Sequence, residues 1–209
     1  MRQFIVLFSL WFLFPNDDFF NDIDLSFDTP TLTWRDSIPD NMPLIKKPFW
    51  SENGMFRKVG IAPPSRYNEL LIRKDMMQWH QKLSLINLSF MSYQYYIGKK
   101  MDENPMKYKN KYESTHKNLG YATFSIYMTS AGLSIFSPPA LEYDKNLSSM
   151  KMHRYLSVIH FTAMSIQPWL GYQSANNPND YDKYMDMHRK TGEVMLASYI
   201  VAFLLTLAP

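Results

Sequence analysis

Two stretches decide the fold, HQKLSLINLSFMS at residues 80–92 and HRYLSVIHFTAMS at residues 153–165. Aligned on their histidines, they are identical at six of thirteen positions. Each stretch leads to a glycine at the same spacing from its histidine, Gly98 after His80 and Gly171 after His153. Chance similarity of two apolar segments would not keep a histidine and a glycine in the same register.

A second pair of segments repeats in the same way. YESTHKNLG at 112–120 and YMDMHRKTG at 184–192 share Tyr, His and Gly in register. The offset between the halves is the same for both pairs of segments to within one position. Similarity at one fixed period indicates an internal duplication, here of a two-helix unit.

The charge pattern divides residues 65–209 into four helices. Helices are predicted at about 65–98, 112–137, 148–173 and 184–208, with Ser65 as a cap after two prolines. Stretches without a charged residue occur at 83–98, 118–141, 155–179 and 194–209, and their apolar parts of about 16 to 20 residues are marginal to adequate for crossing a bilayer. A soluble four-helix bundle is the alternative, but the last stretch has no polar face. We therefore predict an all-α, antiparallel four-helix membrane bundle built from a duplicated two-helix unit.

Residues 1–64 have a different character. Residues 1–15 place one Arg before an apolar run, which predicts a signal peptide or, alternatively, an apolar N-terminus that is never removed. Residues 16–64 contain six prolines, which predict an irregular, extended arm. Linkers are usually poorer in aromatic residues, so we expect the arm to dock onto the bundle or a partner. The aromatic residues we expect to dock include Trp34, Phe49, Trp50 and Phe56.

Composition excludes several classes of function. The formal charge is only +3, with 22 Lys and Arg interspersed among 19 Asp and Glu, which is not the pattern of a nucleic-acid-binding protein. The absence of cysteine excludes disulfides, Cys-ligated zinc and iron–sulfur sites and covalently attached c-type haem. No H-E-x-x-H motif is present, and only one Glu-x-x-His occurs, which disfavours zinc-protease and di-iron sites.

Four histidines lie one apiece in the predicted helices, each on the N-terminal side of its helix's uncharged stretch. Consecutive helices joined by short loops run antiparallel, so His80 is expected to face His153 at one end of the bundle, and His116 to face His188 at the other. Two facing neutral imidazoles can provide both axial ligands of a haem iron. Without cysteine the haem must be held non-covalently, so we predict two b-type haems with these four histidines as ligands.

Glycines accompany the predicted ligands on the same helix faces. Gly98 and Gly171 each follow a histidine of their helix by five helical turns, so they offer a spot without a side chain to the haem at the opposite end. Gly120 and Gly192 follow their histidines by a single turn, where a larger side chain would meet the ring. We list all four as cofactor-binding.

His160 is the fifth histidine and does not fit the repeat. It lies two turns after His153 on the same helix face, and its counterpart in the first half is Asn87. It could replace His153 as a ligand, form a hydrogen bond in the core, or take part in proton or quinone chemistry. The repeat register favours His153 as the ligand, and we predict His160 as a further cofactor-binding residue.

The constellation resembles the cytochrome b561 family. The resemblance rests on four consecutive helices with histidine pairs one–three and two–four, including H-x-x-x-G at 116–120 and 188–192, and covers about residues 75–209. It implies a membrane cytochrome that carries electrons between two b haems across the bilayer. Members of that family commonly have six helices, whereas this chain shows four.

Function and orientation follow as expectations. We expect an electron-transfer component rather than a stand-alone catalyst, embedded in lipid, working with a quinol or a periplasmic or lumenal redox protein and with other subunits of a membrane complex. Residues 99–117 and 183–190 contain nine Lys or Arg and the opposite end seven, which places the first end in the cytoplasm and the arm on the exported side. The alternative is a haem-free structural or assembly subunit whose arm is the working part.

Overall fold

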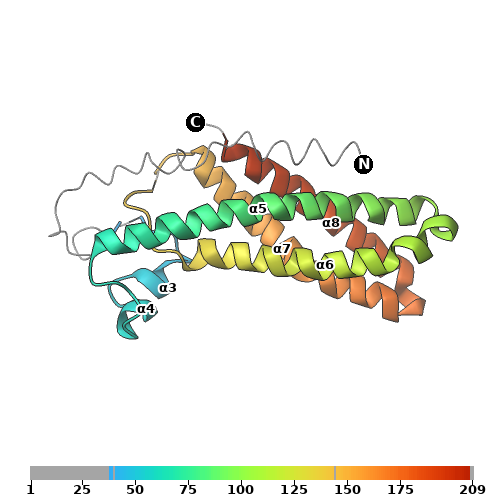
Figure 1. Ribbon diagram of the computed structural model, residues 1–209, viewed down its shortest axis with the longest axis horizontal. Helices are drawn as coiled ribbons and strands as arrows, with labels where there is room; N and C mark the ends of the chain where they lie inside the picture. Colours follow the sequence, from blue (N-terminus) through green and yellow to red (C-terminus); the bar gives the residue numbers. More distant parts are fainter. Residues whose placement is uncertain (1–37, 40, 144, 208–209) are drawn as a thin grey trace. The chain divides into compact units, whose positions relative to one another are not determined.

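The computed structural model describes residues 38–39, 41–143 and 145–207. Within these ranges the chain consists of helices and irregular segments with no strand, so the predicted all-α class is confirmed. Figure 1 shows the elements. They are α3 (Lys47–Trp50), α4 (Met55–Lys58), α5 (Arg66–Glu103), α6 (Pro105–Phe136), α7 (Ser149–Asn176), the 3-10 helix η3 (Pro178–Asp180) and α8 (Tyr181–Leu205).

Three of the long helices begin at residues that favour a helix N-terminus, two at capping serines and one at a proline. The Ser65 hydroxyl accepts a hydrogen bond from the Asn68 amide at 3.3 Å and caps α5, and Ser148 accepts from the Lys151 amide in the same way at α7. Pro105 is the first residue of α6, a position where a backbone N–H would have no acceptor within the helix, so proline costs no hydrogen bond there. The largest difference from the predicted limits is this start of α6, at position 105 instead of about 112.

The arm is less irregular than its proline content predicts. It contains the one-turn helices α3 and α4, and Pro48 is tolerated because it lies in the first turn of α3. Gly60 ends the α4 segment with φ of 73°, and the amides of Gly60 and Ile61 bond back to the carbonyls of Arg57 and Phe56, as in a Schellman motif. The predictions for residues 1–15, for 16–37 and for Trp34 lie outside the described residues.

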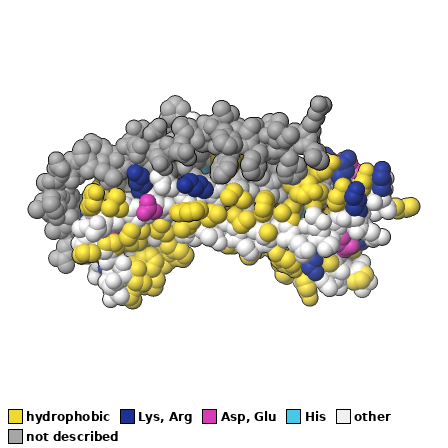
Figure 2. Space-filling model, in the orientation of Figure 1, with side chains coloured by type: hydrophobic (Ala, Val, Ile, Leu, Met, Phe, Trp, Pro, Cys, Tyr) yellow, Lys and Arg dark blue, Asp and Glu magenta, His cyan; other side chains and the backbone are white. Residues whose placement is uncertain are grey.

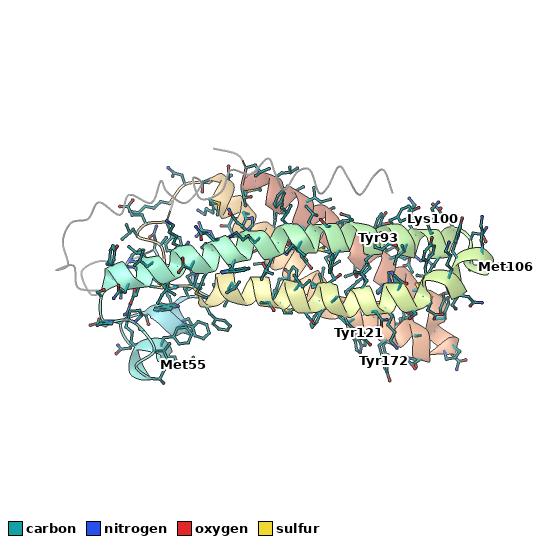
Figure 3. All side chains as sticks on the ribbon, viewed as in Figure 1. Met55, Tyr93, Lys100, Met106, Tyr121 and Tyr172 are labelled. Carbon is teal, nitrogen blue, oxygen red and sulfur yellow. The ribbon has the colours of Figure 1, made fainter. Side chains whose placement is uncertain are left out.

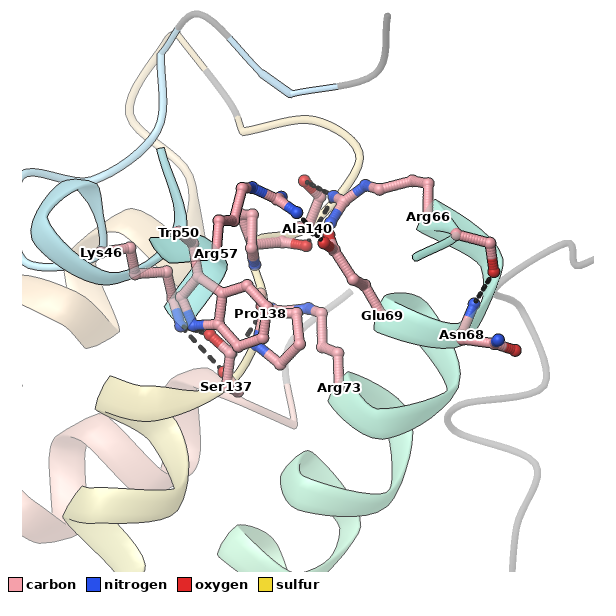
Figure 4. A network of polar contacts seen from close by, with 12 residues as sticks. Lys46, Trp50, Arg57, Arg66, Asn68, Glu69, Arg73, Ser137, Pro138 and Ala140 are labelled. Carbon is pink, nitrogen blue, oxygen red and sulfur yellow. Dashed lines mark hydrogen bonds and ion pairs between the residues drawn. The ribbon is translucent and has the colours of Figure 1, made fainter. Parts of the chain in front are cut away.

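The described residues form two compact units, 38–82 with 132–143, and 83–131 with 145–207. In the first unit, side chains bind consecutive backbone carbonyls at the C-terminal end of α6 and in the turn that follows (Figure 4). A helix C-terminus carries a partial negative charge and unpaired carbonyls, so cations stabilise it. The bonds, all between 2.6 Å and 3.0 Å, run from Lys46 to Ser134 and Ser137, from Trp50 to Phe136, from Arg73 to Pro138, and from Arg66 to Pro139 and Ala140.

Glu69 supplies the counter-charge for this cluster. Its carboxylate is fully buried and accepts from Arg57 at 2.5 Å and from Arg66 at 2.6 Å. Removing one partner of such a buried ion pair is strongly destabilising, because it leaves the other charge without compensation.

Aromatic rings complete the first unit. Phe49 lies edge-on to Phe136 with ring centroids 5.1 Å apart, and Phe56 lies 5.3 Å from Phe49 and 5.2 Å from Trp50. For these aromatic residues of the arm, the predicted docking onto the rest of the chain is confirmed.

In the second unit, contacts join segments of the four long helices. Between α5 and α6, the hydroxyls of Ser84 and Ser130 are 2.9 Å apart. Between α7 and α8, His153 Nδ1 is 2.8 Å from the Ala202 carbonyl oxygen. The Tyr199 hydroxyl of α8 donates to the Ser84 carbonyl of α5 at 3.0 Å. The hydrophobic core of this unit is formed by Met91, Tyr127, Ala163, Met164, Met195 and Tyr199.

The surface of the second unit is unusually apolar. On α7, Val158 and Phe161 are exposed whereas His160 between them is buried. On α8, Val201 and Leu204 are exposed whereas Ser198 is buried. Figure 2 shows hydrophobic side chains along the visible face of the helices. Within the described residues, none of the helices has a segment both long and apolar enough to span a membrane.

We predict that Lys46 makes the stability of the protein depend on pH. Burial, together with the nearby Arg73, lowers the pKa of Lys46 to about 7, against 10.5 for an ordinary lysine. Between these two values the unfolded chain binds more protons than the folded one, so raising the pH stabilises the fold. The thermal midpoint of the wild type relative to Lys46→Met should therefore be constant below pH 7 and rise from pH 7 to about pH 10. A difference that stays flat over the whole range would contradict this.

Candidate functional site

His116 and His188 lie together in the second unit. Their ring centroids are 6.2 Å apart, with the ring planes inclined by 69°. His116 comes from the N-terminal half of the long helix α6, and His188 from the N-terminal half of α8. The structure thus brings together two histidines that the repeat predicted to be a pair.

A glycine lies beside each of these rings. A Cβ atom placed on Gly98 of α5 would be 3.1 Å from Cε1 and 3.5 Å from Nδ1 of His116. A Cβ atom placed on Gly171 of α7 would be 3.2 Å and 3.5 Å from the same atoms of His188. Contacts this short are tighter than side chains normally tolerate, so glycine lets each ring approach the neighbouring helix.

A glutamine side chain lies against the second glycine of each half. A Cβ atom on Gly120 would be 2.8 Å from Nε2 of Gln94, and one on Gly192 would be 3.0 Å from Nε2 of Gln167. The Gln167 amide also donates a hydrogen bond of 2.9 Å to the backbone carbonyl of His188. Gly120 and Gly192 therefore border glutamines rather than open space.

Burial disfavours the charged form of both imidazoles. Burial lowers the pKa of His116, and the backbone of Gln94 opposes part of this effect. Burial, and then the proximity of His116, lower the pKa of His188 to about 4. Both Nδ1 atoms are buried without a hydrogen-bond partner. Neutral imidazole is the form that binds a metal ion.

His153 differs from this pair because its Nδ1 has a hydrogen-bond partner. Its Nδ1 lies 2.8 Å from the Ala202 carbonyl, and a carbonyl can only accept, so Nδ1 donates this bond and Nε2 is the ring nitrogen left for a ligand role. Metal-binding histidines are commonly oriented by such a bond. His80 belongs to the first unit and His153 to the second, so their pairing stays a prediction.

His160 lies in the middle of the second unit. Its Nδ1 is 2.6 Å from the Tyr127 hydroxyl, and its ring centroid is 5.0 Å from that of Tyr199. Asn87, its counterpart in the repeat, is fully buried and donates to the sulfur of Met91 at 3.3 Å. Each half thus contributes one tyrosine and one further polar group to the centre.

Sequence reasoning missed Gln94 and Gln167. Each lies one helical turn before an aligned glycine, Gln94 before Gly98 and Gln167 before Gly171, so the alignment contained the signal. They were overlooked because glutamine is not a usual metal ligand, and only the close approach to the other two glycines makes them part of the site.

Comparison with family models, with curated proteins and with solved structures finds no match to this chain. Among the described residues, no three His, Asp or Glu side chains gather as a metal site. The candidate site is thus the pair His116 and His188 with its glycines.

We predict opposite effects for alanine at different glycines. At Gly132 the new methyl would meet only the Phe136 ring, at 3.9 Å, so Gly132→Ala should stabilise the helix by roughly 0.5–1 kcal/mol. Gly98→Ala and Gly171→Ala should instead destabilise the protein by about 1–3 kcal/mol, because the histidine rings must move. Denaturant unfolding measures all three variants. A gain at Gly98 or Gly171 equal to that at Gly132 would show that the rings are not tightly held.

Proposed function

We propose that this protein is a membrane b-type cytochrome that carries electrons between two bis-histidine haems. His116 and His188 hold one haem, and His80 and His153 hold the other. The four helices form an antiparallel bundle that arose by duplication of a two-helix unit. The observation that carries the proposal is the close pair His116 and His188 flanked by Gly98 and Gly171.

His116 and His188 are the residues that would hold the haem iron at this place, and their Nδ1 atoms have no hydrogen-bond partner. The centroids of His116 and His188 are 6.2 Å apart. When bound, the haem supplies the one-electron chemistry, and the protein supplies axial ligands and a surrounding of low polarity.

Duplication is supported by contacts that recur in the same register. Gly98 meets His116 as Gly171 meets His188, and the second glycine of each half meets a glutamine. The distance from the Cβ position of the glycine to Cε1 of the ring is 3.1 Å in the first half and 3.2 Å in the second. Two unrelated helix pairs would have no reason to repeat these contacts at equivalent places in the sequence.

Insertion into a membrane is supported by the way the polar residues are satisfied. Hydroxyl groups along the helices donate to the carbonyl one turn earlier, as Thr162 does to Val158 at 2.8 Å and Ser165 to Phe161 at 2.8 Å. Such hydroxyls need no water and are compatible with lipid, although they lower the mean hydropathy. The same bond is made by Ser89, Ser92, Thr123, Thr129 and Ser198.

One end of the second unit carries basic and aromatic side chains together. Lys100, labelled in Figure 3, lies over the ring of Tyr96 at 5.8 Å, and Lys107 lies over that of Tyr108 at 5.0 Å. Exposed Tyr121 and Tyr172 lie on the neighbouring helices α6 and α7. Tyrosine and lysine are enriched where helices leave a bilayer, which supports placing this end at the cytoplasmic interface.

The second candidate function is a haem-free subunit of a membrane complex that works through its arm. Trp50 and Lys46 bind backbone carbonyls at the end of α6. This part of the arm is therefore folded, as an arm that binds a partner would need to be. Colour separates the two candidates, because only the cytochrome shows a reduced-minus-oxidised b-type spectrum.

We predict that histidine variants remove haems in pairs. His116→Ala and His188→Ala should each remove the same haem, because each leaves the iron one axial ligand short, and His80→Ala and His153→Ala should each remove the other. His160→Asn is the matched control, since Asn87 occupies the equivalent place, and it should retain both haems. Haem stoichiometry and difference spectra of the purified proteins measure this. Colourless wild-type protein from haem-replete cells would overturn the proposal. Loss of a haem in His160→Asn would show that His160, and not His153, is the ligand.

The orientation is testable because the chain contains no cysteine. Asn53 in the arm and Asn110 in α6 are both exposed and provide matched sites. An impermeant maleimide should label Asn53→Cys in intact cells, whereas Asn110→Cys should react only after the membrane is opened. The reverse pattern would show that the arm is cytoplasmic.

A further inference from the structure

We propose that Gln167, and Gln94 in the equivalent place, are positioning residues that hold the histidine-bearing helices α8 and α6 against their partners. The inference rests on the proposed function, since it assigns these glutamines to the haem site of His116 and His188. Neither glutamine is a ligand. Gln167 acts through the backbone of the helix that carries the ligand, and Gln94 lies against the glycine at the equivalent place.

The contact of Gln167 is specific. Its Nε2 donates to the backbone carbonyl of His188 at 2.9 Å and lies 3.0 Å from the point where a Cβ of Gly192 would be. The amide therefore enters a notch that exists only because position 192 is glycine. The notch lies one turn after the histidine, so the bond fixes the turn from which the imidazole projects.

The first half repeats the approach of a glutamine amide to the second glycine. Gln94 Nε2 lies 2.8 Å from the Cβ position of Gly120, which follows His116 by one helical turn. In addition, Gln167 Oε1 is buried without a hydrogen-bond partner. A buried acceptor without a donor is destabilising, so a purely structural requirement would favour a different side chain at this position.

Fixing the backbone of a ligand is a recognised way to tune a metal site, and losing such support typically weakens metal binding about 10-fold to 100-fold. Gln167→Ala should therefore reduce the haem affinity of the His116–His188 site by about 10-fold or more. Gln173→Ala, on the same helix but away from any glycine notch, is the control and should leave that affinity unchanged. Gln94→Ala should resemble Gln167→Ala.

A double-mutant cycle separates positioning from a general loss of stability. Gly192→Ala displaces the amide, so it should mimic Gln167→Ala, and the double variant Gln167→Ala/Gly192→Ala should bind haem no worse than either single variant. Full haem affinity in Gln167→Ala, or losses that add in the double variant, would overturn the inference.

A second readout needs no haem and distinguishes this inference from the proposed function. In thermal unfolding of haem-free protein, Gly192→Ala should lower the midpoint in the wild-type background but raise it in the Gln167→Ala background, where alanine only improves helix propensity. That reversal of sign would support the lock between α7 and α8 even if the wild type binds no haem. The same sign in both backgrounds would show that the amide does not occupy the notch.

Discussion

The close approach of two histidine rings to two glycines is the constraint on which the second unit depends. At Gly98 and at Gly171 even a methyl group would lie within about 3.2 Å of an imidazole carbon. Helices that meet over glycine can come closer than helices separated by larger side chains. The position of α6 against α5, and of α8 against α7, is therefore set at the same place as the candidate ligands.

The same constraint relates the two halves of the unit. The rings of His116 and His188 meet each other, and each rests on the helix that precedes its own in the chain. Toward the middle, Tyr127 bonds His160, whereas Tyr199 bonds the Ser84 carbonyl as well as Asn87, the counterpart of His160, so the related tyrosines share only part of their contacts. The two halves make the same contacts where the histidine rings meet the glycines, and partly different contacts at the centre.

The sequence predicted most of the helices and pointed to the histidines and glycines of the candidate site, but not to its glutamines. Histidine and glycine are rare enough that their register survives in an alignment of two halves, which is why His116, His188 and their glycines could be found. The contacts of Lys46 and Arg66 could not be found in this way. They bind the backbone carbonyls of Ser137 and Pro139, which are remote in the chain. Because every residue has a backbone carbonyl, no residue type in the sequence identifies these acceptors. The pairing of His80 with His153 stays a prediction because they lie in different units.

The hydroxyl groups that bond to their own helices have a consequence for sequence change. Because Thr162 and Ser165 are satisfied by carbonyls of α7, neither contributes a bond that a neighbouring helix requires. An alanine, valine or serine at such a position would leave the contacts between helices intact. The outer surface can therefore diverge almost freely, while only a few inward positions preserve the architecture. A chain built in this way can lose most of its resemblance to its relatives and still fold and work as they do.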